Sequence, residues 1–188
     1  MSHATTVLDQ QGISRLQAVI HDLVSQYKAD PDSAQAEFRA TTHTVKNFHT
    51  EARSRDFRIT IDEPEVLGGT NQGPNPVEVL LGALGTCQQI VIAAYAAALG
   101  IELNEIEIDV RGKLDLRGLL SVAEVPSGFQ SINFEARIEA KNASAEQLET
   151  LKSLALAHCP VLDTLQRPVS VTNQYRLVSA SAPLSRAV

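Results

Sequence analysis

Hydrophobic residues near the start of the chain recur three and four positions apart. From Ile13 to Tyr27 they share one side of a helical projection, with polar residues on the other, which is the pattern of an amphipathic helix. Proline and turn formers at Ala29-Asp-Pro-Asp-Ser33 predict its end. We therefore expect an N-terminal helical extension in residues 1–33, a main domain in 34–178 and a loose C-terminal tail in 179–188.

After this helix, the sequence contains segments in which apolar residues alternate with polar ones, so that the hydrophobic pattern has a period of two residues. This pattern predicts antiparallel strands with one face in a core and one in water, over residues 35–45, 48–53, 57–61, 106–110, 132–138 and 169–178. The first two flank a short Lys46-Asn47 turn. Residues 114–127 show no dominant period, and we expect a strand end followed by a loop there.

Two further helices are predicted in the main domain. Residues 77–99 are apolar nearly all round, after a possible Asn75 cap and Pro76 and before Gly100, so we expect a long helix at the centre of the protein. Ser144-Ala-Glu-Gln147 is a capping-box pattern that opens another helix, and Pro160 limits its end.

Composition narrows the class of protein. The 188 residues are 44% hydrophobic and 20% charged, which suits one domain with a small appendage. The net charge is -6 and basic residues form no stripe, so nucleic acid is not an expected partner. The N-terminal residues do not resemble a secretory signal, and the apolar run Ile90–Leu99 is about half the roughly 20 residues of a membrane span. We expect a cytoplasmic protein that does not cross a membrane.

The two cysteines are the candidates for chemistry. On a helix, Cys87 shares its face with apolar residues such as Leu84 and Val91, so it could be a buried small hydrophobe, and Cys159 could be one as well. Burial raises the pKa of a thiol, so a reactive Cys87 would need a cation from elsewhere in the fold. Neither cysteine has another Cys or a His two to four positions away, and we expect no metal site.

A longer signature surrounds these cysteines. The segment from Leu67-Gly-Gly-Thr70 through Asn75-Pro76 to Cys87, together with His158-Cys159-Pro160, resembles the OsmC/Ohr family, named after osmotically inducible protein C and the organic hydroperoxide resistance protein. The resemblance implies an α+β fold in the form of an OsmC-like swapped homodimer, with long buried central helices wrapped by antiparallel sheets and its sites at the subunit interface.

The same resemblance implies a function in oxidative stress defence. Cys87 would attack an organic hydroperoxide and become a sulfenic acid, and Cys159 would condense with it to form a disulfide. A dithiol or lipoyl-type reductant would restore the thiols, with no metal or bound cofactor. Apolar walls would favour alkyl or fatty-acid peroxides.

The charged residues that the family uses to activate the thiolate differ in this chain. Lys46 stands in the hairpin turn where the peroxide-reducing members have arginine, and Glu78 lies one residue after the family's glutamate position, which Val77 occupies. Nine steps of about 100° place Glu78 on the far side of the helix from Cys87. Cys87, Cys159, Lys46 and Glu78 are therefore the candidate catalytic residues.

Two other functions fit the same residues. A non-catalytic OsmC-like protein could hold a hydrophobic or thiol ligand at its dimer interface, with the cysteines only packing or conjugating. Alternatively, the N-terminal helix could dock a partner or cover the pocket, in a purely structural or interaction role.

Overall fold

The computed structural model describes residues 6–178, so the expected tail in 179–188 lies outside the described residues. Its α-helices are α1 (Gln10–Ala29), α2 (Pro76–Leu99), α3 (Leu116–Leu119), α4 (Ala145–His158) and α5 (Pro160–Gln166). Short 3₁₀ helices are η1 (Pro31–Ala34) and η2 (Glu65–Leu67). The strands are β1 (Thr41–Lys46), β2 (His49–Ser54), β3 (Phe57–Ile61), β4 (Leu103–Leu114) and β5 (Phe129–Ala140).

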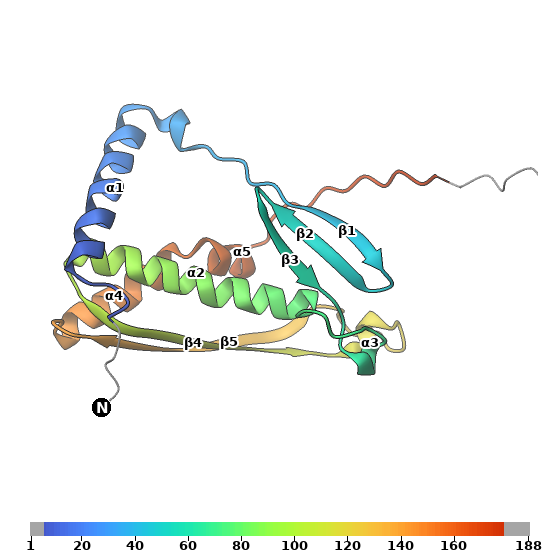
Figure 1. The fold of residues 1–188 in the computed structure, drawn as a ribbon. Helices are drawn as coiled ribbons and strands as arrows, with labels where there is room; N and C mark the ends of the chain where they lie inside the picture. Colours follow the sequence, from blue (N-terminus) through green and yellow to red (C-terminus); the bar gives the residue numbers. More distant parts are fainter. Residues whose placement is uncertain (1–5, 179–188) are drawn as a thin grey trace, which may run out of the picture.

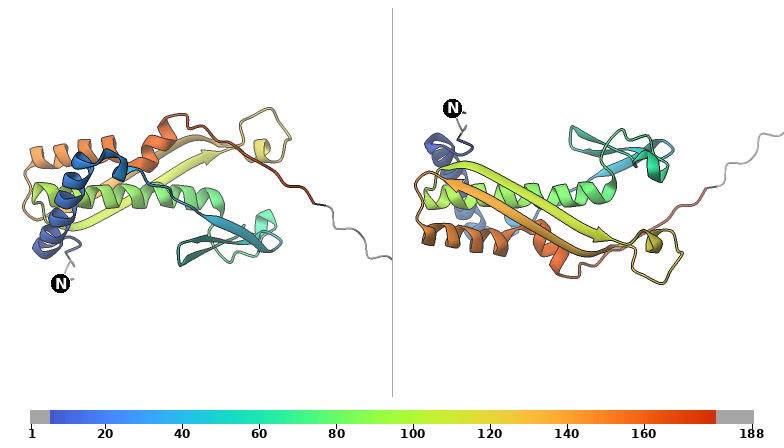
Figure 2. Two further views of the ribbon diagram at one scale, coloured as in Figure 1. Left: turned by 90° about the horizontal axis from the view of Figure 1, so that it is seen from above. Right: turned by 90° about the horizontal axis from the view of Figure 1, so that it is seen from below.

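Helix α2 is the axis of the molecule. The antiparallel pair β4–β5 runs along one side of it, α4 and α5 lie beside it, and α1 rises from its C-terminal end (Figure 1). The antiparallel sheet β1-β2-β3 projects at the opposite end, as the views from above and below also show (Figure 2). The α+β class is confirmed, with two small sheets and a central helix.

The ends of α2 follow from local chemistry. Asn75 and Glu78 form a reciprocal capping box, Pro76 occupies the first turn, and Gly100 closes the helix at φ 70°. The cap satisfies N–H groups that have no partner within the helix, and the glycine adopts a left-handed conformation that other residues disfavour. The predicted long helix is confirmed.

The hydrophobic core has two parts, both built on α2. The larger cluster centres on Ile92, Ala96 and Leu151 and includes Ile13 of α1. The smaller cluster contains Leu84, Cys159 and Leu162, with Cys87 packed against it. The candidate cysteines therefore lie inside one of the two cores.

Some sequence predictions differ from the structure. The predicted strand 169–178 is wrong: this segment has no regular structure and extends away from the body (Figure 1). An alternating sequence forms a strand only beside another strand edge, and none pairs with it in the described chain. Strand β1 begins at Thr41, not at residue 35, and the predicted loop in 114–127 contains the short helix α3.

Helix α2 is long and apolar enough to cross a membrane by length and composition alone. Within the chain, however, it packs against β4, α4, α5 and α1, which is the position of a core helix. Only 22% of an apolar 18-residue stretch of it is buried inside the single chain. Ile90 is among its exposed apolar residues, so one side of the central helix has no cover from its own chain.

Candidate active site

The two cysteines come together from distant parts of the sequence. Cys87 lies in the middle of α2, and Cys159 lies between α4 and α5. Their Sγ atoms are 3.3 Å apart, and both thiols are free. Disulfide formation needs a further approach of only about 1.3 Å, to the bonded distance of roughly 2.05 Å.

Pro160 explains the position of Cys159. Proline cannot continue α4 without losing a hydrogen bond, but it fits the first position of a new helix. Helix α5 therefore starts at Pro160, and Cys159 becomes its N-cap residue. The Leu162 N–H donates to Cys159 Sγ at 3.5 Å, and the Val161 N–H donates to Cys87 Sγ. The first turn of α5 thus supplies donors to both sulfur atoms.

The two thiols differ in exposure. Cys159 is 1% exposed, whereas Cys87 is half-buried. Burial raises the pKa of the Cys87 thiol above its ordinary value, while the Val161 N–H acts in the opposite direction. No basic side chain of the described chain contributes to this pKa shift. Within residues 6–178 of one chain, the sulfur pair therefore has no cation that would ionise it.

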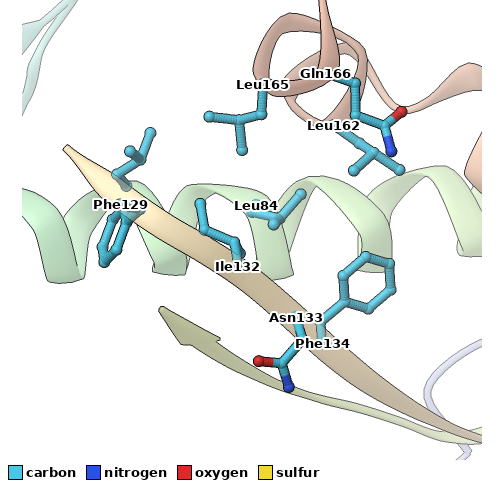
Figure 3. Close-up of a pocket in the computed structure, with 9 residues that line it drawn as sticks. Leu84, Phe129, Ile132, Asn133, Phe134, Leu162, Leu165 and Gln166 are labelled. Carbon is cyan, nitrogen blue, oxygen red and sulfur yellow. The ribbon is translucent and has the colours of Figure 1, made fainter. Parts of the chain in front are cut away.

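An apolar cavity of about 620 Å³ lies against the cluster that contains the two cysteines, and Figure 3 shows the residues that line it. Leu84, Ile132, Phe134 and Leu162 line this cavity and also belong to the cluster that contains the cysteines. In Figure 3 the carboxamides of Gln166 and Asn133 stand among the apolar side chains that line this space. The volume and lining are those of a site for a small organic molecule.

The structure does not bring Lys46 and Glu78 to the sulfur pair within one chain. Glu78 is exposed and its Oε2 accepts a hydrogen bond from the Asn75 N–H at 2.8 Å. It lines a separate cavity with Gly85 and Val110 on the β4 side of α2, because the helix is regular from Pro76 to Leu99. Lys46 is exposed at the end of β1, in the projecting sheet.

Asp62 is a buried acid that sequence reasoning missed. Its carboxylate accepts hydrogen bonds from the Glu63 N–H at 2.8 Å, from the Thr70 hydroxyl at 2.6 Å and N–H at 3.0 Å, and from the Gln72 N–H at 3.2 Å. These bonds, led by that from the Thr70 hydroxyl, lower the pKa of Asp62 to about 2. Asp62 therefore organises the loop that leads into α2.

Glycines allow this loop to close around Asp62. A Cβ atom on Gly69 would lie 1.8 Å from the Glu63 carbonyl oxygen, and one on Gly73 would lie 2.3 Å from that of Thr60. Only glycine permits such close approach of two backbone segments. The glycine-rich pattern was the available sequence signal, but nothing in it indicated that the loop wraps a carboxylate.

Gln88 is the second residue that the sequence did not single out. It follows Cys87 on α2, is 1% exposed, and its Nε2 atom has no hydrogen-bond partner. It lies one helical turn from Leu84, which packs with Cys159, and one turn from Ile92 in the larger core. Because it is enclosed within its own chain, a second protein could not reach this amide.

The histidine beside Cys159 has a packing role. The His158 ring lies against the Tyr95 ring, with centroids 5.3 Å apart. In residues 6–178, no group of three His, Cys, Asp or Glu side chains is arranged to hold a metal ion.

Comparison with known proteins gives matches over most of the main domain. A family model described as OsmC-like protein matches residues 69–173. One curated relative, the uncharacterized protein YmaD of Bacillus subtilis (strain 168), is 36% identical over 59 residues, which are 31% of this chain and 39% of YmaD. The match thus spans less than half the length of that relative.

Solved structures share the fold. An OsmC-like protein from Mycoplasma pneumoniae aligns with a TM-score of 0.58 and 23% identity, covering 70% of this chain and 89% of that one. The organic hydroperoxide resistance protein OsmC from Legionella pneumophila aligns with a TM-score of 0.51 and 18% identity, covering 71% of this chain and 91% of that one.

Proposed function

Because the chain belongs to the OsmC-like protein family, we propose that it is a homodimeric thiol peroxidase that reduces organic hydroperoxides in oxidative stress defence. One observation carries this proposal: a half-buried thiol and a fully buried thiol lie with their sulfur atoms 3.3 Å apart, in a cluster whose Leu84 and Leu162 also line an apolar cavity. This arrangement suits a nucleophile that meets substrate and a second thiol that follows it.

Cys87 performs the first step. Its thiolate attacks the outer oxygen of the hydroperoxide, so that an S–O bond forms and the O–O bond breaks. The remaining alkoxide takes up a proton and leaves as an alcohol, while Cys87 becomes a sulfenic acid. The exposure of the two residues supports this assignment, since Cys159 is enclosed and Cys87 is accessible.

Cys159 performs the second step. Its sulfur attacks the Cys87 sulfenic acid, a disulfide forms, and the hydroxyl group leaves with a proton as water. A dithiol or lipoyl-type reductant then exchanges with the disulfide and restores both thiols. A reducing, cytoplasmic setting suits this cycle.

The apolar cavity supports the choice of substrate. Its walls include Leu80, Phe129 and Leu165, and it adjoins the cluster that contains Cys87. An alkyl group gains free energy when it leaves water for such a space, whereas hydrogen peroxide has no apolar part to bury. We therefore assign alkyl or fatty-acid hydroperoxides as substrates.

A second copy of the chain supplies the missing cation in this proposal. The sheet β1-β2-β3 exposes Val45, Phe48, Phe57 and Ile59, and a small sheet with uncovered apolar residues is not stable alone. In the proposed swapped dimer this sheet covers the partner, and Lys46 at its turn approaches the partner's thiol pair. Glu78 then acts from the interface as the acid that holds the lysine.

Stopped-flow oxidation with cumene hydroperoxide tests the function. The wild-type protein should lose thiol rapidly and turn over with dihydrolipoamide. Cys87→Ser should abolish the rapid phase, and Cys159→Ser should keep it for a single turnover. Slow and equal reaction of both cysteines would reject the peroxidase.

The cavity also supports a second candidate, a binding protein for a hydrophobic or thiol-containing ligand. In that case the thiols pack or conjugate and do not turn over. Native mass spectrometry of the purified protein should then detect a bound apolar molecule, which the Leu165→Gln substitution in the cavity wall should displace. An unliganded mass together with rapid peroxide turnover would exclude this candidate.

A further inference from the structure

In the part of the chain that the structure describes, the first half of helix α1 makes the closest contacts with the rest of its own chain. Ile13 is 1% exposed in the larger core, and Leu16 packs against the same cluster. The Gln17 Nε2 donates a hydrogen bond of 2.8 Å to the Ala97 carbonyl oxygen at the end of α2. These contacts anchor the first half of α1.

The apolar face continues along the second half, where Ile20 is half-buried but most of the face is left uncovered by its own chain. Val19, Leu23, Val24 and Tyr27, here called the distal stripe, are each between 39% and 50% exposed. At about 100° per residue they lie within one face of roughly 140°, which overlaps the face of Ile13 and Leu16. An apolar face of this width normally packs against another protein surface.

The segment after α1 connects the distal stripe to the projecting sheet. Residues 35–40 are exposed, and Phe38 is 94% exposed. The Arg39 carbonyl oxygen accepts a hydrogen bond from the Ser54 hydroxyl at 3.3 Å. In Figure 1, α1 and the sheet stand at opposite ends of α2, both on the side away from β4 and β5. A partner on that side of α2 therefore meets both.

The total exposed area is far larger than that of a compact chain. It amounts to 14,855 Å², whereas a compact monomer of this mass exposes about 8,800 Å². Part of the difference of about 6,000 Å² belongs to the extended C-terminal segment. The difference is still several times the roughly 800 Å² that each partner buries in a standard interface.

We propose that the distal stripe of α1 docks on a second copy of this chain, so that α1 is an arm that packs against the partner subunit. This inference rests on the dimer of the proposed function and adds an element outside residues 69–173, the part that matches the family. The polar side of α1 carries Arg15, Asp22 and Lys28, a mixed set without the basic face typical of a lipid-binding helix.

A pair of charge-matched variants tests the arm. Leu23→Asp with Tyr27→Asp places two negative charges in the stripe, whereas Ala18→Asp with Ser25→Asp places two on the opposite, exposed side of the same helix. Sedimentation velocity over a dilution series should show a dimer dissociation constant at least roughly tenfold higher for the stripe variant than for the wild type. Burial of two apolar side chains of this size stabilises a complex by at least the free energy that corresponds to such a change. The control should dimerise like the wild type.

Equal dimerisation of the stripe variant and the wild type would overturn the arm but leave the proposed dimer intact. A monomeric wild type would reject the dimer, and the arm with it. A photo-crosslinking amino acid at position 23 keeps the test decisive if the stripe variant misfolds. In mixed ¹⁴N and ¹⁵N dimers it should join copies of different mass, with no such product from position 25. Crosslinks confined to one chain would contradict the arm.

Discussion

Cys159 lies with its sulfur 3.3 Å from that of Cys87 and is the more deeply buried of the two. The pair is asymmetric in a second way, because each sulfur receives a different N–H from the first turn of α5, Cys87 from Val161 and Cys159 from Leu162. This asymmetry assigns different roles to chemically identical groups and leads to the first prediction.

Cys159→Ser should stop the cycle after its first step. Without the second thiol, the sulfenic acid on Cys87 persists, and dimedone should label Cys87 after one equivalent of cumene hydroperoxide. Mass spectrometry of the peptides checks the position of the label. Cys87→Ser is the matched control and should give no adduct; labelling of Cys159 in that variant would reverse the two roles.

Lys46→Met should raise the pKa of Cys87 and slow its reaction near neutral pH. Burial already raises this pKa within one chain, so removing a cation supplied by the partner leaves the thiolate less stable. The rate of iodoacetamide alkylation against pH measures the pKa, in the Cys159→Ser background. Lys46→Arg should retain the wild-type pKa of Cys87, and Lys152→Met, which removes the exposed partner of Glu149, should leave that pKa unchanged. An unchanged profile in Lys46→Met would exclude this lysine.

Asp62→Asn should destabilise the protein at neutral pH and alter its response to acid. The pKa of Asp62 is about 2 in the folded chain, below its ordinary value of 3.8. A lowered folded-state pKa stabilises the fold above pH 4, and this stabilisation is lost as the pH falls from about 4 towards 2. Urea unfolding at several pH values should show that the variant loses less free energy of unfolding than the wild type as the pH falls. Asp56→Asn, in the exposed β2–β3 turn, should show the same dependence of the free energy of unfolding on pH as the wild type.

Gln88→Met should stabilise the fold by about 1 kcal/mol, since it removes a buried donor that has no partner while nearly keeping the volume. Gln89→Met is the matched control on the next residue, because the Gln89 Nε2 donates to the Ile106 carbonyl oxygen at 3.1 Å. Losing that bond should destabilise the fold by about 1 kcal/mol. Urea unfolding measures both. A destabilised Gln88→Met would show that the amide has a partner in solution.

Local patterns were sufficient for much of the fold. The helix over 77–99 and the hairpin around Lys46-Asn47 were predicted correctly, because caps, turns and periodicity act between residues a few positions apart. Asn47 indeed has a positive φ of 53° at that turn. The strand predicted in 169–178 failed for the converse reason, since strand pairing depends on a neighbour that the segment itself does not specify.

The family signature, the central helix and the two candidate cysteines could all be identified from the amino-acid sequence. Three features required the folded chain: α4 and α5 bring Cys159 to 3.3 Å from Cys87, a loop closes around Asp62, and Lys46 and Glu78 lie away from the thiols of their own chain. Contacts between residues such as Cys87 and Cys159, 72 positions apart, arise because whole elements pack together, and short-range sequence patterns do not encode that packing.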